Sequence, residues 1–126
     1  NEYLVSFDVE SLYPNVPMKH VTNCIKVWLI SRNIDEDTVQ EYLLLINLCM
    51  SQNSFKFNDI FYKQVEGTAM GNPLSCFIAN VFLRYFEIQA KQTLQYFPRV
   101  WIRYVDDVFA VFSHNEDLQH FVTLLN

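Results

Sequence analysis

Two short apolar segments near the end of the chain, Val100–Val105 and Val108–Phe112, are separated only by Asp106 and Asp107. Both segments are rich in the β-branched and aromatic residues that strands favour, and so short a gap is typical of a β-hairpin. The sequence therefore predicts an antiparallel hairpin with two adjacent carboxylates at its tip. Like charges side by side raise the free energy of ionising both, unless a cation compensates. On this pair alone, a polar turn is the simpler interpretation, because Asp favours turns.

A third acid, Asp8, changes that interpretation. It lies near the end of residues 3–9, whose apolar pattern predicts a largely buried strand, where an unpaired charge is costly. An antiparallel sheet that places this strand beside the hairpin brings Asp8 next to Asp106. Three carboxylates would then form a hard-oxygen site suited to Mg²⁺, with Mn²⁺ as a substitute and the carbonyl of Val9 as an extra ligand. Two such ions about 4 Å apart can hold the attacking and leaving oxygens of a phosphoryl transfer.

The remaining patterns are mostly helical. Apolar residues recur at helical spacing from Met18 to Ser31 and again after Asp35, which is a candidate N-cap followed by two acids. Asn72 as cap and Pro73 as the first helical residue predict a long helix that ends near Gln95. A further helix is expected to begin near Glu116.

Two other features concern the middle of the chain. Phe55–Phe57 and Ile60–Gln64 flank Asn58-Asp59 and predict a second hairpin. The sequence contains two glycines, Gly67 and Gly71, and their closeness predicts a backbone that bends or is closely approached there. We therefore expect one α+β unit with an antiparallel sheet packed on helices on one face.

Composition limits the class of protein. With 51% hydrophobic and 16% aromatic residues, the chain is too apolar to be disordered and is long enough for one core. A net charge of −5 with scattered basic residues argues against a free-standing nucleic-acid binder. The charge is still compatible with an acidic active site that binds nucleic acid through metal ions and other domains.

Several other residues receive simpler interpretations. The three cysteines (Cys24, Cys49 and Cys76) lack zinc-ligand spacing and are expected to be buried, reduced thiols of an intracellular protein. Arg103 shares a strand face with Trp101, which we interpret as a solvated face in preference to a nucleic-acid contact. Lys56 and Lys63 are interpreted as ordinary edge-strand charges. No apolar segment is long enough to span a membrane, and no secretory signal is present.

Three blocks, in this order, resemble the motifs of reverse transcriptases. Ser6–Tyr13 resembles polymerase motif A, Gly67–Leu74 resembles motif B, and Tyr104–Asp107 resembles motif C. The strings FDVESLYPNVP, FYKQVEGTAMGNPL and WIRYVDDVF are most similar to those of Penelope-like retroelement reverse transcriptases. The resemblance covers nearly the whole chain, and three ordered motifs are far more specific than one.

This resemblance implies a fold and an activity. It implies that residues 1–126 are a partial polymerase palm, truncated at both ends, without fingers and thumb. The implied reaction is RNA-directed DNA synthesis by two-metal nucleotidyl transfer to a primer 3′-hydroxyl, within a retrotransposon. An RNA template, a DNA primer, a dNTP and the missing fingers and thumb would be its partners. The protein would then act inside the cell, in the nucleus.

The resemblance also implies residue roles. It assigns metal binding and catalysis to three carboxylates and to the Val9 carbonyl beside them: Asp8, Asp106 and Asp107. Tyr13 matches the steric gate that favours dNTPs, and a nucleotide- and template-binding loop is implied at Gly71, Asn72 and Pro73. Asn72 and Gly67 depart from the family, because many relatives have Ser and Gln there.

Alternatives remain at this point. Residues 8–14, DVESLYP, also resemble motif A of family B DNA polymerases, but the motifs B and C usual in that class do not appear. A catalytically inactive retroelement remnant or interaction module is the second hypothesis. A metal-dependent phosphohydrolase is the third, although motif A lacks the further acids or Lys that it usually needs. Because the fingers and thumb are missing, we predict no detectable polymerase activity for the isolated chain.

Overall fold

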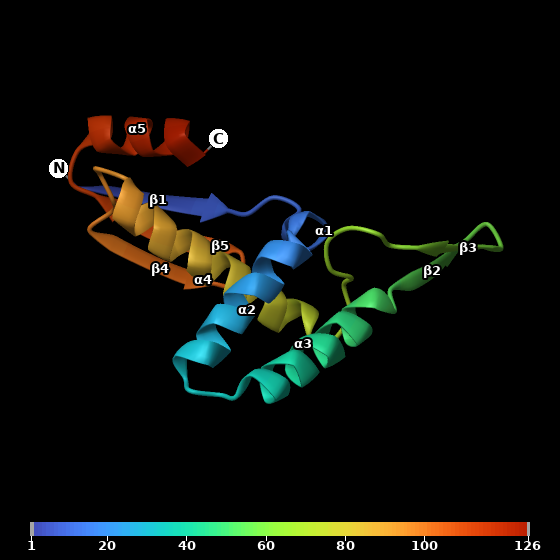
Figure 1. The fold of residues 1–126 in the computed structure, drawn as a ribbon. Coiled ribbons are helices and arrows are strands. Elements are labelled where there is room, and N and C mark those ends of the chain that lie inside the picture. The colour runs from blue at the N-terminus through green and yellow to red at the C-terminus, as the bar shows by residue number, and fades with distance from the viewer. Residues whose placement is uncertain (1, 126) are drawn as a thin grey trace. The chain divides into compact units, whose positions relative to one another are not determined.

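The computed structural model describes residues 2–125, and Figure 1 shows its helices and strands. The chain divides into two compact units. The first unit comprises the residues up to Glu10 and those from Phe86 onward, and the second comprises Ser11–Tyr85. The mixed α+β class predicted from the sequence is confirmed, although it is distributed over two units and not one.

The first unit contains a three-stranded antiparallel sheet. Its strands are β1 (Tyr3–Asp8), β4 (Val100–Tyr104) and β5 (Asp107–Phe112), in the order β1-β5-β4. The hairpin β4–β5 and its pairing with β1 confirm the arrangement expected from the apolar segments.

Helical segments cover one face of this sheet. Phe121 of α5 (Asn115–Leu125) is 1% exposed, and its ring centroid lies 5.3 Å from that of Phe112 and 6.0 Å from that of Phe7. Trp101 of β4 joins this cluster, with its ring 5.7 Å from Phe121. Helices on one face of the sheet are thus confirmed, and the first unit has an aromatic core.

The opposite face of the sheet is open. Leu4 is 71% exposed and Ile102 61%, because their side chains point away from the helices. The prediction that residues 3–9 form a largely buried strand is therefore wrong, since β1 alternates exposed and half-buried residues. The apolar residues of β1 that face the helices are partly buried, whereas those on the opposite face are exposed.

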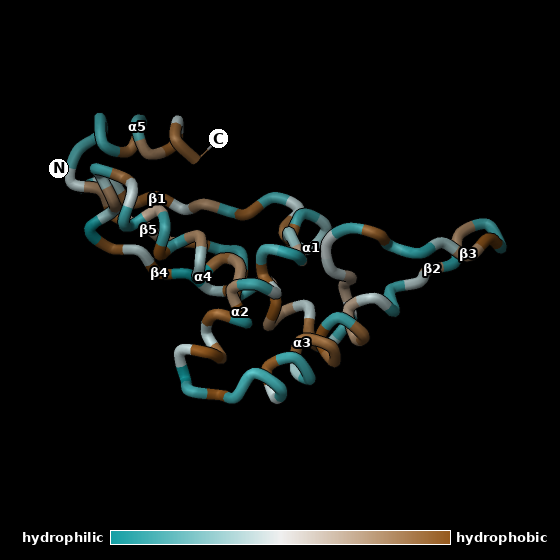
Figure 2. Tube along the Cα trace, viewed as in Figure 1, coloured by the Kyte–Doolittle hydropathy of each residue, from teal (hydrophilic) through white to brown (hydrophobic). Residues whose placement is uncertain are grey.

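The second unit begins with helices. They are α1 (Leu12–Asn15), α2 (Met18–Ser31) and α3 (Glu36–Ser51), and α4 (Ser75–Thr93) starts within this unit. The bounds of α2 match the predicted helix, whereas α1 was not predicted, because Pro14 and Pro17 indicated an irregular segment. Figure 2 shows hydrophobic residues recurring along α3, and its inward positions Val39 and Met50 are buried.

The predicted N-cap of α3 is confirmed. The carboxylate of Asp35 accepts the Thr38 N–H at 2.9 Å, and this bond holds the pKa of Asp35 below its ordinary value of 3.8. Because the pKa of Asp35 is lower in the folded state than in the unfolded state, the cap stabilises α3 fully at pH values above the unfolded-state pKa. That contribution is lost as the pH falls through the folded-state pKa.

We therefore expect Asp35→Ala to lower the melting temperature at neutral pH, because α3 loses its capping bond. The difference from the wild type should shrink steadily below about pH 4. Thermal melts followed by circular dichroism at several pH values measure this effect. The control is Glu41→Gln, on the exposed side of α3, and a pH-independent difference for Asp35→Ala would contradict the capping account.

The second hairpin also forms as predicted. It pairs β2 (Ser54–Phe57) with β3 (Ile60–Lys63) around Asn58 and Asp59, which have φ of 47° and 61°. Positive φ at both central residues is typical of a type I′ turn, which suits the twist of a hairpin. The Lys56 ammonium lies 2.8 Å from the Asp59 carboxylate in an exposed pair, consistent with an ordinary edge-strand charge.

The cysteines differ from expectation. Cys24 is partly buried, and burial raises the pKa of its thiol. Cys49 and Cys76 are exposed, so the prediction that all three are buried is wrong. Among residues 2–125, no helix is long and apolar enough to cross a membrane.

Candidate active site

The three acids singled out from the sequence lie at one end of the first unit's sheet. Asp8 is the last residue of β1 and pairs in register with Asp107, the first residue of β5. Directly paired residues project to the same face of a sheet, so these two carboxylates share the open face. Asp106 lies in the adjoining turn, and its carbonyl accepts the Val9 N–H at 3.2 Å.

The register differs in one detail from the arrangement expected from the sequence. The turn consists of Val105 and Asp106, because Tyr104 pairs with Asp107. Asp8 therefore faces Asp107 across the strands, and not Asp106 as expected. Asp8 and Asp107 are exposed and Asp106 is partly buried, so an argument from buried charge does not apply to them.

The acids suit a divalent cation by chemistry and by placement. Within residues 2–125, no three His, Cys, Asp or Glu side chains are grouped as a ready-made metal site. Mg²⁺, however, is usually held by one or two carboxylates and completed by water and substrate phosphates. Asp8 and Asp107 provide such a pair on one face, and Asp106 lies next to it along the chain. The donor set therefore fits a hard cation.

The turn that carries Asp106 has a strained backbone. Val105 has a φ of 57°, whereas Asp106 does not have positive φ. This combination is typical of a type II′ turn, which favours Gly at its first central position. A β-branched residue in this region is unusual, and such strain clusters at functional sites.

We expect Val105→Gly to raise the free energy of unfolding by about 1 kcal/mol, because relief of left-handed strain exceeds the added unfolded-state entropy. Val105→Ala keeps a Cβ but removes the branch, so it should raise the free energy of unfolding by less. Urea denaturation measures both changes. A loss of stability with Gly would show that the Val105 side chain contributes more than its backbone costs.

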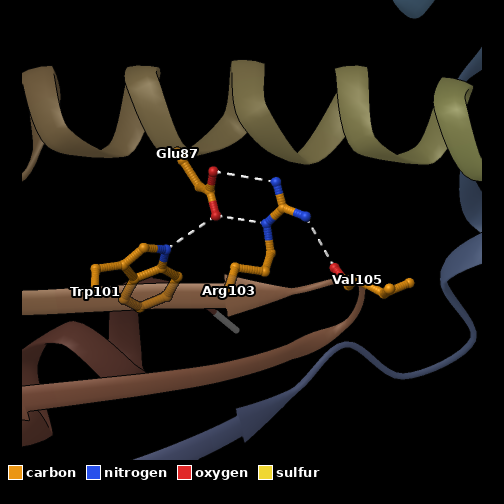
Figure 3. A network of polar contacts seen from close by, with 4 residues as sticks. All are labelled: Glu87, Trp101, Arg103 and Val105. Carbon is orange, nitrogen blue, oxygen red and sulfur yellow. Dashed lines mark hydrogen bonds and ion pairs between the residues drawn. The ribbon is translucent and has the colours of Figure 1, made fainter.

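A polar network lies on the covered face of β4, as Figure 3 shows. The Arg103 guanidinium donates to both carboxylate oxygens of Glu87 on α4, through Nε at 2.6 Å and Nη2 at 3.3 Å. Trp101 donates its indole N–H to the same carboxylate at 3.0 Å. Arg103 Nη1 also donates to the Val105 carbonyl at 2.9 Å. The network thus links α4, β4 and the turn that holds Asp106.

Two conclusions from the sequence change here. Arg103 is not on a solvated face, because its side chain is 13% exposed and paired with Glu87. Glu87 itself was missed. Its signal was an acid at helical spacing between Leu83 and Ala90, two buried positions of α4. An acid in such a stripe requires a partner.

In the second unit, the Gly67 region is held against α1. Thr68, which is 1% exposed, donates its backbone N–H to the Tyr13 carbonyl at 2.8 Å, and its hydroxyl lies 3.4 Å from the same oxygen. Gly67 has a φ of 70°, and a Cβ there would lie 2.2 Å from the Pro14 carbonyl oxygen. The predicted close approach at Gly67 is confirmed, whereas Thr68 was missed.

The following residues form a turn before α4. Gly71 has a φ of 91° in open space, which confirms the predicted bend. The Asn72 amide donates to the Cys49 carbonyl at 3.0 Å, and its oxygen accepts the Leu74 N–H at 3.0 Å. Because Asn72 closes this turn, α4 begins at Ser75, two residues later than predicted. Nucleotide contact by Gly71, Asn72 and Pro73 stays a prediction.

Residues 1–126 match the family model described as "Reverse transcriptase (RNA-dependent DNA polymerase)". The chain belongs to the reverse transcriptase family. Its fold is similar to that of a solved structure, the apo telomerase from Candida tropicalis truncated from the C-terminal domain, with a TM-score of 0.66 and 16% identity. The match covers 97% of this chain and 26% of that chain. No curated protein matches it. The fold of this reverse transcriptase family member is that of a polymerase palm.

Proposed function

We propose that this chain is the palm segment of an RNA-directed DNA polymerase, in which Asp8, Asp106 and Asp107 hold two divalent ions. The observation that carries the proposal is the register of β1 and β5, which brings all three acids to one end of the sheet in a reverse transcriptase family member. Nucleotidyl transfer requires such oxygen donors beside the reacting phosphate.

The residues of the first unit would act together. Asp8 and Asp107 offer carboxylates from one face of the sheet, and the Val9 N–H fixes the peptide that follows Asp106. The carbonyl of Val9 is a candidate further ligand. Mg²⁺ bound there, or Mn²⁺ in its place, would activate a primer 3′-hydroxyl and neutralise the charge of the triphosphate.

The second unit would contribute nucleotide selection. We assign the role of sugar gate to Tyr13, whose backbone is held by Thr68 and closely approached by Gly67. Gly71, Asn72 and Pro73 would lie against the nucleotide and the template. These roles rest on the family membership and on two resemblances: the segment with Tyr13 resembles motif A, and the segment with Gly71, Asn72 and Pro73 resembles motif B.

The whole reaction would require more than these residues. The chain spans about a quarter of the telomerase chain that it resembles, and we propose that fingers and thumb come from outside it. Its partners would be an RNA template, a DNA primer and a dNTP. The motif strings favour a retrotransposon origin of the Penelope-like type and action in the nucleus.

A titration with Mn²⁺ tests the metal site. We expect the chain to bind Mn²⁺, detected as loss of the free-ion electron paramagnetic resonance signal, and Asp106→Asn to weaken binding about tenfold or more. Asp59→Asn is the matched control, because this acid is exposed on the other unit and Asn tolerates its backbone. Equal binding by the wild type and Asp106→Asn would contradict the proposed site.

Primer extension on an RNA template tests the need for further domains. We expect no extension by the isolated chain, because the chain spans about a quarter of the telomerase chain that it resembles and positioning of template and primer would require further domains. Extension that disappears in Asp106→Asn would support the polymerase assignment and overturn the need for separate fingers and thumb.

A further inference from the structure

Asp106 lies between two peptide groups, and a hydrogen bond from outside the turn holds each of them. The peptide that precedes Asp106 presents the Val105 carbonyl, which accepts from Arg103 Nη1 at 2.9 Å. The peptide that follows presents the Asp106 carbonyl, which accepts the Val9 N–H at 3.2 Å. Together these two bonds restrict the backbone angles on both sides of the Asp106 Cα.

The Arg103 side chain is well placed for this task. It approaches the turn from the covered face of the sheet, where the Glu87 carboxylate holds it through Nε and Nη2. The indole N–H of Trp101 fixes Glu87 in turn (Figure 3). A guanidinium has a rigid planar fork of donors, so anchoring two nitrogens aims the third.

The strain at Val105 explains why the turn needs this support. Type I′ and type II′ turns share a positive φ at the first central residue and differ mainly in the orientation of the central peptide. Rotation of that peptide would move the Val105 carbonyl away from Arg103 and give Asp106 a positive φ. The hydrogen bond from Arg103 opposes this rotation and keeps Asp106 in its present conformation.

We propose that Arg103, anchored by Glu87, is a positioning residue that holds Asp106 in its metal-binding orientation. It acts through the Val105 carbonyl and does not touch the metal or the substrate. This inference rests on the proposed function, because it assigns Arg103 to the same carboxylate site. It means that metal binding on the open face of the sheet depends on hydrogen bonds made on the covered face.

The test compares Mn²⁺ affinity in variants that separate positioning from stability. Arg103→Met alone leaves the partly buried Glu87 carboxylate without its cationic partner and can unfold the first unit. The double variant Arg103→Met with Glu87→Met removes both charges and is expected to stay folded. Arg103→Lys keeps the ion pair, but its single ammonium lacks the fork that reaches both Glu87 and Val105.

We expect Mn²⁺ affinity to fall about tenfold in the double variant and in Arg103→Lys, with the far-ultraviolet circular dichroism spectrum unchanged. The control removes the exposed pair formed by the residues just before β4 and β1, Arg99→Gln with Glu2→Gln, and should bind Mn²⁺ as the wild type does. Amide signals of Val9 and Asp107 in ¹⁵N NMR spectra should be broadened by Mn²⁺ in the wild type and less so in both variants.

Each outcome decides one question. A folded double variant with wild-type Mn²⁺ affinity would overturn the positioning role, because stability alone would then explain the network. If the wild type itself binds no Mn²⁺ near Val9, the proposed metal site fails, and with it the role of Arg103 in metal binding. A tenfold loss in both variants, with the control unchanged, supports the inference.

Discussion

Replacing Gly67 by alanine is expected to lower the free energy of unfolding of the second unit by about 3 kcal/mol, whereas the same change at Gly71 should cost about 1 kcal/mol. Both glycines have positive φ, so both variants introduce left-handed strain. Only at Gly67 would the new Cβ meet backbone, 2.2 Å from the Pro14 carbonyl oxygen, whereas Gly71 has nothing within 4 Å.

Urea denaturation measures both variants, and hydrogen exchange of the Thr68 amide reports the contact directly. In Gly67→Ala, α1 and the loop must separate, so the bond from Thr68 to the Tyr13 carbonyl should open and its amide should exchange faster. In Gly71→Ala the Thr68 amide should remain protected. Equal destabilisation by both variants would mean that backbone strain, and not close packing against α1, determines the need for glycine.

Phe121→Ala is expected to destabilise the first unit by about 3–5 kcal/mol, because it empties the centre of the aromatic core. Its ring packs against those of Phe7, Trp101 and Phe112, which belong to all three strands. Loss of this ring should also disturb the end of the sheet that carries the acids. The expected size of the effect follows from the near-complete burial of Phe121.

Chemical denaturation in a Trp28→Phe background, followed by the fluorescence of Trp101, measures this change, because the Trp101 indole lies 5.7 Å from the Phe121 ring. Leu124→Ala on the same helix is the control. Because Leu124 is 52% exposed, this variant should lower the free energy of unfolding by less than about 1 kcal/mol. Comparable losses for Phe121 and Leu124 would show that α5 does not complete the core.

The sequence was sufficient for the elements whose signals are local. The helix Met18–Ser31, the Asp35 cap and both hairpins follow from residue spacing and turn chemistry over a few positions. Pairing of β1 with the β4–β5 hairpin was expected as the arrangement that would bring Asp8 close to the hairpin acids. The start of α4 was misplaced, because the Asn72 side chain closes a turn with Leu74 that delays the helix.

The features that could not be predicted depend on distant residues. Arg103 finds Glu87 on another element, and nothing in the strand pattern specifies which helix covers that face. The turn at Val105–Asp106 depends on how Asp107 pairs with both neighbouring strands, so its position was off by one residue. The exposure of β1 depends on whether a second layer covers the sheet, which apolar composition alone does not reveal.

The three acids were singled out from the sequence, and their role in metal binding stays a prediction, whereas the residues that support them were not recognised. The acids stand out because charge is unusual within apolar strands, whereas Thr68 and Glu87 have their effects through contacts with the backbone or with another side chain. Such supporting residues carry weak sequence signals. An acid at helical spacing among apolar residues, as at Glu87, is the kind of signal that could reveal them.

Anomalous diffraction from crystals grown with Mn²⁺ and a dNTP tests the central claim most directly, because it locates the metal without reference to activity. We expect an anomalous peak at the end of the sheet, about 2.2 Å from carboxylate oxygens of Asp8 and of Asp106 or Asp107. A peak elsewhere, with none at this end of the sheet, would contradict the assignment of these acids as the metal site of a polymerase palm.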